Sequence, residues 1–157
     1  MSWRDVTLGE VVTLQRGYDL TEGERKPGRV PVVSSAGISD YHAEAKASGP
    51  GVVTGRYGTL GRVYFIREDF WPHNTTLFVK DFHGNDRRFV YYLLGAQKLA
   101  DHSAVSAVPG VNRNDLHRLI GNHSPPPVEM NVKDVLCPIF GFASQMRLWY
   151  DNNHATD

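Results

Sequence analysis

The feature that most constrains the fold of this chain is a pair of strand-like segments joined by a glycine-rich connection. Residues 51–55 (GVVTG) and 62–66 (RVYFI) are rich in the β-branched and aromatic side chains that strands favour. The connection, residues 56–61 (RYGTLG), contains two glycines, which adopt the backbone conformations of tight turns at little cost. This pattern predicts two strands joined by a hairpin or a bulged loop.

Two further segments have the composition of strands. Residues 30–33 (VPVV) form a short apolar run, but Pro31 cannot donate a backbone hydrogen bond and therefore restricts the run to a sheet edge or to the start of a strand. Residues 75–79 (TTLFV) are again β-branched and aromatic. The polar residues 34–50, which follow the first run, predict a loop.

Helical periodicity is strongest in the segment after the last predicted strand. Apolar residues at three- and four-residue steps predict a helix from Asp86 to Leu99, and the pair Asn85-Asp86 offers a cap for its first turn. Residues 6–14 and residues 112–116 each fit either a helical turn or a strand. Four aromatic residues are expected in the hydrophobic core rather than in a stacking platform for bases: Phe65, Phe78, Phe89 and Tyr92.

A polyproline segment divides the chain into two parts. Residues 125–127 (PPP) form a stiff spacer, so we place one domain at residues 1–127 and a second segment at 128–157. Apolar residues in the second segment follow a two-in-seven pattern, which is typical of a helix that pairs with another helix. Pro138 and Gly141 interrupt and weaken this helix. The residues expected to face the partner helix are Val132, Val135, Ile139, Phe142, Met146 and Trp149.

Together these elements predict an α+β fold. We expect a twisted, mostly antiparallel sheet with a few helices, followed by a projecting C-terminal coiled-coil-type helix. The single cysteine, Cys137, cannot form an internal disulfide, and no apolar run reaches the roughly 20 residues of a membrane-spanning helix. Because nothing in the sequence resembles a signal peptide, we expect a cytoplasmic protein without membrane contact.

The distribution of charge bears on function more than its sum does. Seventeen Lys and Arg residues balance seventeen Asp and Glu residues, whereas an isolated DNA-binding domain is usually basic. From Lys46 to Arg67, however, the chain carries four basic residues and no acidic one. A neutral total is therefore compatible with one basic face and with weak DNA affinity of the isolated chain.

The sequence lacks the motifs of common catalytic and metal sites. Its seven histidines include no His-x-x-x-His pair, and its one cysteine excludes a cysteine pair, so no metal-ligand spacing occurs. The nucleophile elbow, the phosphate-binding loop and the dinucleotide-binding fingerprint are also missing. We therefore predict a protein that binds without catalysing and that has no metal or cofactor of its own.

The chain carries a series of short motifs spread over almost its whole length. They are LGEV (8–11) with RG (16–17), VPVVSSAGI (30–38), GRYGTLGRVY (55–64), FWPHNTTLFV (70–79), SAVPGVNRNDL (106–116) and PPP (125–127). One such motif is weak, whereas the series in this order is fairly specific. With this series the chain resembles a target-recognition domain of the specificity subunits of Type I restriction–modification systems.

The resemblance implies a subunit that supplies sequence specificity for double-stranded DNA. A partner methyltransferase subunit would methylate adenine with S-adenosylmethionine, and a restriction subunit would cut the DNA. Members of the family usually carry two recognition domains joined by long paired helices, whereas this chain has one, so we expect a half-subunit, a truncated product or a fragment. Its C-terminal helix is then expected to bind the methyltransferase subunit and a second specificity half, either a second copy or a different chain.

Side chains in the predicted loops are the candidates for DNA contact, because base edges in the major groove are read by directional donors and acceptors. For the loop at residues 56–61, the alternative is a hairpin whose glycines serve turn geometry and whose arginine is solvated. For Asn74, which has the chemistry to read adenine, the alternative is capping a turn; for Arg113, it is turn formation or phosphate binding. The candidates are Ser34, Ser35, Tyr41, His42, Lys46, Arg56, Tyr57, Thr59, His73, Asn74 and Arg113.

Two other functions are compatible with the sequence. One is a protein-interaction module, a half-subunit or truncated subunit without DNA affinity of its own; the neutral charge favours it, and failure to shift random duplex DNA would support it. The other is a small hydrolase or ligand-binding domain that uses His42 or His73 in a pocket. This last function predicts neither salt-sensitive DNA binding nor a helical partner.

Overall fold

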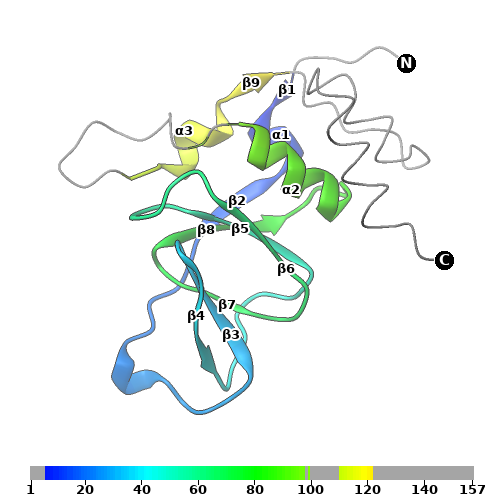
Figure 1. The fold of residues 1–157 in the computed structure, drawn as a ribbon. Coiled ribbons are helices and arrows are strands. Elements are labelled where there is room, and N and C mark those ends of the chain that lie inside the picture. The colour runs from blue at the N-terminus through cyan, green and yellow to red at the C-terminus, as the bar shows by residue number, and fades with distance from the viewer. Residues whose placement is uncertain (1–5, 98, 100–109, 122–157) are drawn as a thin grey trace, which may run out of the picture. The chain divides into compact units, whose positions relative to one another are not determined.

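The described part of the chain contains three sheets and three α-helices (Figure 1). A computed structural model describes residues 6–97, 99 and 110–121, all of which belong to one compact unit, Met1–His123. The mixture of helices with antiparallel and parallel pairing confirms the α+β class, although the strands are divided among three sheets rather than gathered in one. The predicted spacer and C-terminal helix lie outside the described residues, so they and the boundary at residue 127 stay predictions.

The largest sheet has four antiparallel strands, in the order β2 (Thr13–Arg16), β8 (Thr76–Asp81), β5 (Gly51–Gly55) and β6 (Val63–Ile66). β5 and β6 pair with Val53 opposite Tyr64, which confirms the predicted hairpin. β8 confirms the strand expected at residues 75–79 and inserts between β2 and β5. The hairpin is thus extended by one strand that follows it in the sequence, β8, and by one that precedes it, β2.

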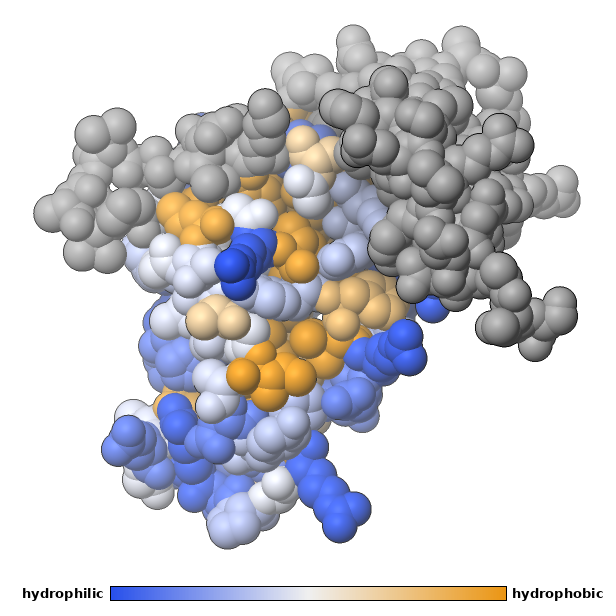
Figure 2. Space-filling view, in the orientation of Figure 1, coloured by the Kyte–Doolittle hydropathy of each residue, from blue (hydrophilic) through white to orange (hydrophobic). Residues whose placement is uncertain are grey.

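A second sheet has three strands, in the order β4 (Gly37–His42), β3 (Val30–Ser34) and β7 (Trp71–Pro72). β3 and β4 form an antiparallel hairpin, whereas β7 pairs with β3 in parallel. The chain reaches β3 from β2 through a connection that contains a short 3-10 helix, η1 (Glu22–Glu24). In the view of Figure 2, the surface over this part of the molecule is mostly hydrophilic.

Of two sequence predictions about this sheet, one holds in one of its two alternatives and the other is wrong. Pro31 does not place its segment at an edge, because β3 is the central strand. The proline is tolerated because pairing with β7 begins only at Val32. The alternative prediction, that Pro31 marks the start of a strand, is confirmed. Residues 34–50 are not a continuous loop, because Gly37–His42 form β4. A polar segment suits this position, since an edge strand leaves part of its surface to solvent.

Both segments with ambiguous periodicity are resolved. Residues 6–14 contain a strand, β1 (Val6–Thr7), and a short helix, α1 (Leu8–Val11), before β2 begins. Residues 112–116 comprise the N-cap Asn112 and most of a helix, α3 (Arg113–His117), which is followed by β9 (Ile120–Gly121), the partner of β1. The Nε2 atom of His117 accepts a hydrogen bond from the Leu14 amide at 2.9 Å, which ties α3 to the four-stranded sheet.

Helix α2 (Arg87–Ala96) confirms the predicted helix and its cap, although it ends at Ala96 and not at the predicted Leu99. The Asp86 carboxylate accepts a hydrogen bond from the Phe89 amide at 2.9 Å, which satisfies a donor that the first helical turn leaves unpaired. The helix packs against β5 and β6, as Figure 1 shows. Its buried face follows from the three- and four-residue spacing of Phe89, Val90, Leu93 and Leu94.

One hydrophobic cluster lies between the four-stranded and three-stranded sheets. Successive residues of a strand point to opposite faces, so Val53 can face β3 while its neighbour Val52 points the other way. The rings of Phe70 and Phe78 meet edge to face in this core, with centroids 6.5 Å apart. Of the aromatic residues expected in the core, Phe78 and Phe89 are buried, and Phe65 and Tyr92 are half-buried. The cluster between the sheets comprises Val33, Val53, Ile66, Phe70 and Phe78.

Candidate nucleic-acid interface

Three turns meet at one end of the two larger sheets, and we call them the turn cluster. They are the β3–β4 turn (34–37), the β5–β6 loop (56–62) and the β7–β8 turn (73–75). Thr75 joins all three: its carbonyl oxygen accepts a hydrogen bond from the Arg56 amide at 2.8 Å, and its hydroxyl accepts one from the Ser35 amide at 3.2 Å. Segments far apart in the sequence therefore form one surface.

Glycines hold the β5–β6 loop closed. A β-carbon on Gly55 would lie 2.0 Å from the carbonyl oxygen of Thr59, so no other residue fits there without a shift of the backbone. Gly58 and Gly61 have φ angles of 76° and 79°, which L-residues rarely adopt. The Thr54 hydroxyl donates a hydrogen bond to the Arg62 carbonyl at the base of the loop. These contacts fix the backbone of the loop, from which its polar side chains extend.

Arg56 and Tyr57 form a stack at the tip of the turn cluster. The guanidinium carbon of Arg56 lies 4.3 Å from the centroid of the Tyr57 ring, within the range of a cation–π contact. The ring in turn lies against Gly110, where a β-carbon would come within 2.3 Å of it. The Val111 amide donates to the Arg56 carbonyl at 2.9 Å, which joins the segment that leads into α3. The stack therefore presents an oriented guanidinium on a partly exposed ring.

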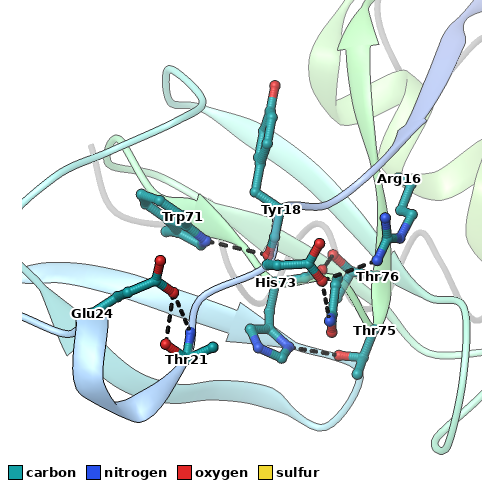
Figure 3. Close-up of polar contacts among 10 residues, drawn as sticks. Arg16, Tyr18, Thr21, Glu24, Trp71, His73, Thr75 and Thr76 are labelled. Carbon is teal, nitrogen blue, oxygen red and sulfur yellow. Dashed lines mark hydrogen bonds and ion pairs between the residues drawn. The ribbon is translucent and has the colours of Figure 1, made fainter.

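The β7–β8 turn carries His73 and Asn74. The carbonyl of His73 accepts hydrogen bonds from the amide and the hydroxyl of Thr76, at 3.0 and 2.7 Å, and these bonds close the turn. Figure 3 shows His73 with its ring beside Thr75, the Nδ1 atom lying 3.4 Å from the threonine hydroxyl. The side-chain amide of Asn74 takes no part in closing the turn and instead donates to Asp19 at 2.5 Å.

The remaining candidates in or near the turn cluster differ in accessibility. Ser35 is buried, and the Ser34 hydroxyl is used within its own turn, donating to the Gly37 carbonyl at 3.1 Å. Thr59 is half-buried in the β5–β6 loop. Arg113 is exposed at the first turn of α3, two residues beyond the Val111 contact with Arg56. Arg113 thus lies next to the surface formed by the Arg56–Tyr57 stack.

Three predicted site residues lie at the far end of β4, away from the turn cluster. His42 is buried, accepts a hydrogen bond from the Lys26 amide at 3.0 Å, and packs edge-on against Trp71. The Lys46 ammonium lies 5.3 Å from the Trp71 ring centroid, and Tyr41 is exposed. A strand advances about 3.3 Å per residue, so the length of β4 separates this group from the turn cluster. The candidates from residues 34–50 thus fall into two groups.

Two functional candidates were not singled out by the sequence pattern, Arg16 and Asp19. Both are exposed next to the β7–β8 turn, and the Arg16 guanidinium donates to the Asp19 carboxylate at 3.0 Å. The hydrogen bond from Asn74, together with the nearby Arg16 charge, holds the pKa of the Asp19 carboxyl below its usual value. The one signal that pointed to this region was Arg16-Gly17, which is part of the first motif of the series.

The turn cluster is richer in arginine than in acidic residues. Arg16, Arg56 and Arg62 lie within or beside it, and Arg113 adjoins it. Among the described residues, Arg56, Arg62 and Arg113 form no ion pair, whereas Arg16 pairs with Asp19. Guanidinium groups without a carboxylate partner are suited to phosphates and to guanine edges. The neutral net charge of the chain therefore coexists with a locally basic surface.

The described part of the chain offers neither a metal-ion cluster nor a membrane-spanning helix. Within residues 6–97, 99 and 110–121, no group of three or more His, Cys, Asp and Glu side chains is placed to hold a metal ion. No helix within the same ranges combines the length and the apolar character needed to cross a membrane.

Comparison with protein families identifies the class of this chain. Residues 1–120 match the family described as Type I restriction modification DNA specificity domain, so the chain belongs to this family. The resemblance inferred from the motif series is thereby confirmed. Specificity subunits are non-catalytic, in agreement with the prediction that the chain is not an enzyme. Among curated proteins, none matches the sequence.

Solved structures share the fold of this chain at low sequence identity. The S subunit of a Type I restriction–modification system from M. genitalium has a TM-score of 0.64 and 17% identity, over 76% of this chain and 33% of that one. The HsdS subunit from Thermoanaerobacter tengcongensis has a TM-score of 0.63 and 16% identity, over 97% and 40% of the two chains. A chain from a structure described as the basis of complex assembly and conformational transition of the type I R-M system has a TM-score of 0.66 and 13% identity, over 94% of this chain and 38% of that one. This chain therefore spans between a third and two fifths of these relatives.

Proposed function

We propose that this domain recognises a short sequence of double-stranded DNA with its turn cluster and confers that specificity on a Type I restriction–modification complex. The observation that supports this proposal most strongly is the meeting of three turns from two sheets around Thr75, next to the Arg56–Tyr57 stack. Loops on a rigid scaffold are the usual carriers of recognition in proteins. Family membership supplies the class of target, which is DNA.

The side chains of the turn cluster divide into two roles. Arg56 and Arg113 are the candidates for phosphate contacts, which supply most of the affinity and fix the register on the duplex. Asn74 and His73, on the neighbouring turn, carry the directional donors and acceptors that read base edges. Tyr57 acts through its ring, which holds the Arg56 guanidinium in place. Ser35 and His42 are buried, and we leave them out of the proposed contact surface.

Complex formation belongs to the same proposal. The chain spans only part of its structural relatives, and the C-terminal segment at residues 128–157 carries the apolar pattern of a pairing helix. We propose that this helix binds the methyltransferase subunit, and through it the restriction subunit, and a second specificity half. S-adenosylmethionine would then be bound by the methyltransferase subunit and not by this chain. The competing function is an interaction module without DNA affinity, which the neutral net charge favours.

Fluorescence anisotropy with the full chain and a labelled random-sequence duplex separates the two functions. We expect binding that weakens between about 50 and 200 mM salt, because each neutralised phosphate releases counterions. Arg56→Ala is expected to weaken binding and to reduce the slope of log K against log salt by about 1. Arg67→Ala is the matched control, since it removes the same charge from an exposed position at the other end of β6. Equal behaviour of the two variants would contradict the proposed contact surface.

A further inference from the structure

The residue with the strongest chemistry for reading a base, Asn74, is held by a second side chain from another part of the domain. Its Nδ2 atom donates to the Asp19 Oδ1 atom at 2.5 Å, across 55 positions of sequence. The Arg16 Nη2 atom donates to the same oxygen at 3.0 Å. In Figure 3, a dashed line from the Arg16 guanidinium marks this second bond. Asp19 is therefore the common acceptor for an amide and a guanidinium.

The backbone fixes the distance between Asp19 and Asn74. The Gly17 amide donates to the Thr76 carbonyl at 3.0 Å, and the Tyr18 amide donates to the Pro72 carbonyl at 2.8 Å. These bonds lie on either side of the β7–β8 turn. A β-carbon on Gly17 would lie 2.0 Å from the His73 carbonyl oxygen, so the two chains are as close as glycine permits. The contact between the two side chains thus rests on a tightly packed backbone.

The charge of Asp19 determines which way round the Asn74 amide lies. An ionised carboxylate only accepts hydrogen bonds, so the NH2 end of the amide must face it. The Oδ1 atom of Asn74 then points away from the carboxylate, and it has no hydrogen-bond partner among the described residues. One N–H of the amide is used by Asp19, and the second N–H stays available. The amide therefore keeps one acceptor and one donor for a ligand.

We propose that Asp19 is a positioning residue, which sets the Asn74 amide to read adenine in the target sequence. This inference rests on the proposed function and names one base class for that surface. Adenine offers an N6 donor and an N7 acceptor in the major groove, which match Oδ1 and the second N–H of Asn74. Guanine offers two acceptors at the same edge, and the Oδ1 atom of an amide held this way finds no donor there.

Arg16 makes an acidic positioning residue compatible with DNA. A carboxylate close to phosphates is repelled by them, but the guanidinium of Arg16 neutralises the charge of Asp19 at 3.0 Å. Asp19 and Arg16 are both well exposed, with relative side-chain accessibilities of 65% and 49%, so the pair lies on the surface that DNA would approach. The guanidinium of Arg16 has further N–H groups, which can donate to a phosphate oxygen.

Selection of random duplexes by the full chain, followed by sequencing, tests this inference. The wild type is expected to enrich a motif in which one position requires adenine, and Asn74→Ala loses the preference at that position. Asp19→Ala is expected to lose the same preference while the other positions are kept. A bidentate contact gives about 5- to 150-fold discrimination, which falls to near unity in both variants. Glu24→Ala is the matched control, because Glu24 is another exposed carboxylate that accepts two hydrogen bonds.

Two further readouts separate positioning from a general structural defect. Asp19→Ala removes a negative charge, so its affinity for non-specific duplex DNA is expected to equal or exceed that of the wild type. In the double variant, Asp19→Ala is expected to add nothing to the effect of Asn74→Ala on discrimination, because it acts through that residue. A merely structural residue would instead lower non-specific affinity and add its own effect.

The outcomes distinguish this inference from the function on which it rests. If the wild type enriches no motif, the proposed function is overturned and the inference with it. If the wild type enriches a motif that Asp19→Ala leaves unchanged, the inference alone is overturned. Loss of preference at every position by Asp19→Ala, together with a lower Tm, also overturns it, because Asp19 would then support the fold and not one base contact.

Discussion

The close approach between Gly17 and the β7–β8 turn makes Gly17→Ala a direct test of the packing that positions Asp19. The new β-carbon would lie 2.0 Å from the His73 carbonyl oxygen and 2.6 Å from that of Pro72, whereas ordinary contacts are 3.4–4 Å. Both obstacles are backbone atoms, so no rotation of a side chain relieves the clash. The two segments must separate until that contact reaches at least 3.4 Å.

The cost of that separation follows from the bonds it breaks. The hydrogen bonds from the Gly17 amide to Thr76 and from the Tyr18 amide to Pro72, now 3.0 and 2.8 Å, flank the contact. Each is worth about 0.5–1.5 kcal/mol net, so the free energy of unfolding is expected to fall by roughly 1–3 kcal/mol. The same separation moves Asp19 away from Asn74, and base discrimination is expected to fall with stability.

Urea unfolding followed by tryptophan fluorescence measures the effect of Gly17→Ala. With a slope of about 1–3 kcal/mol per M, the midpoint is expected to fall by on the order of 1 M. Gly23→Ala is the control, because a β-carbon there meets nothing within 4 Å; it is expected to be neutral or slightly stabilising. If Gly17→Ala unfolds at the same midpoint as Gly23→Ala, the tight packing between these segments is refuted.

The remaining predictions concern α3 and the C-terminal segment. Burial, followed by the charges of Arg113 and His83, lowers the pKa of His117, and its Nε2 atom accepts the Leu14 amide only in the neutral form. The contribution of this hydrogen bond to stability is therefore complete above a pH of about 6.5, the pKa of histidine in the unfolded chain, and it is lost as the pH falls through the lower pKa of the folded protein. The plot of Tm against pH is expected to be flatter for His117→Gln than for the wild type. Parallel curves would refute this. Ile139→Asp, outside the described residues, is expected to abolish helix pairing in light scattering and methyltransferase pull-down, and unchanged assembly would refute the predicted interface.

Local sequence was sufficient to predict an element wherever the contacts that define it lie within one short segment. The β5–β6 hairpin follows from two β-branched segments and glycines that take positive φ angles between them. Helix α2 follows from apolar spacing and from Asp86, which caps it three residues before its bonding partner Phe89. In both cases the contacts that define the element join residues close in sequence, so the sequence of that segment alone is enough to predict it.

The sequence was insufficient where the outcome depended on the position of a strand within its sheet, at the edge or in the centre. Nothing in VPVV indicates that β7, a strand of two residues, pairs with it in parallel and makes β3 central. Residues 37–42 are polar enough for a loop, and they form β4 because β3 lies beside them to accept its hydrogen bonds. Strand formation depends on the neighbour more than on the segment itself.

The candidate site divides in the same way between sequence and structure. The motifs of the sequence determined the family and pointed to Arg56, Tyr57, His73 and Asn74 as polar residues in loops. Only the tertiary structure showed that Thr75 joins three turns, that His42 is buried against Trp71, and that Asp19 holds Asn74. Composition and spacing report which groups a chain carries. The direction of a hydrogen bond between residues 55 positions apart is decided only when the backbone brings them together.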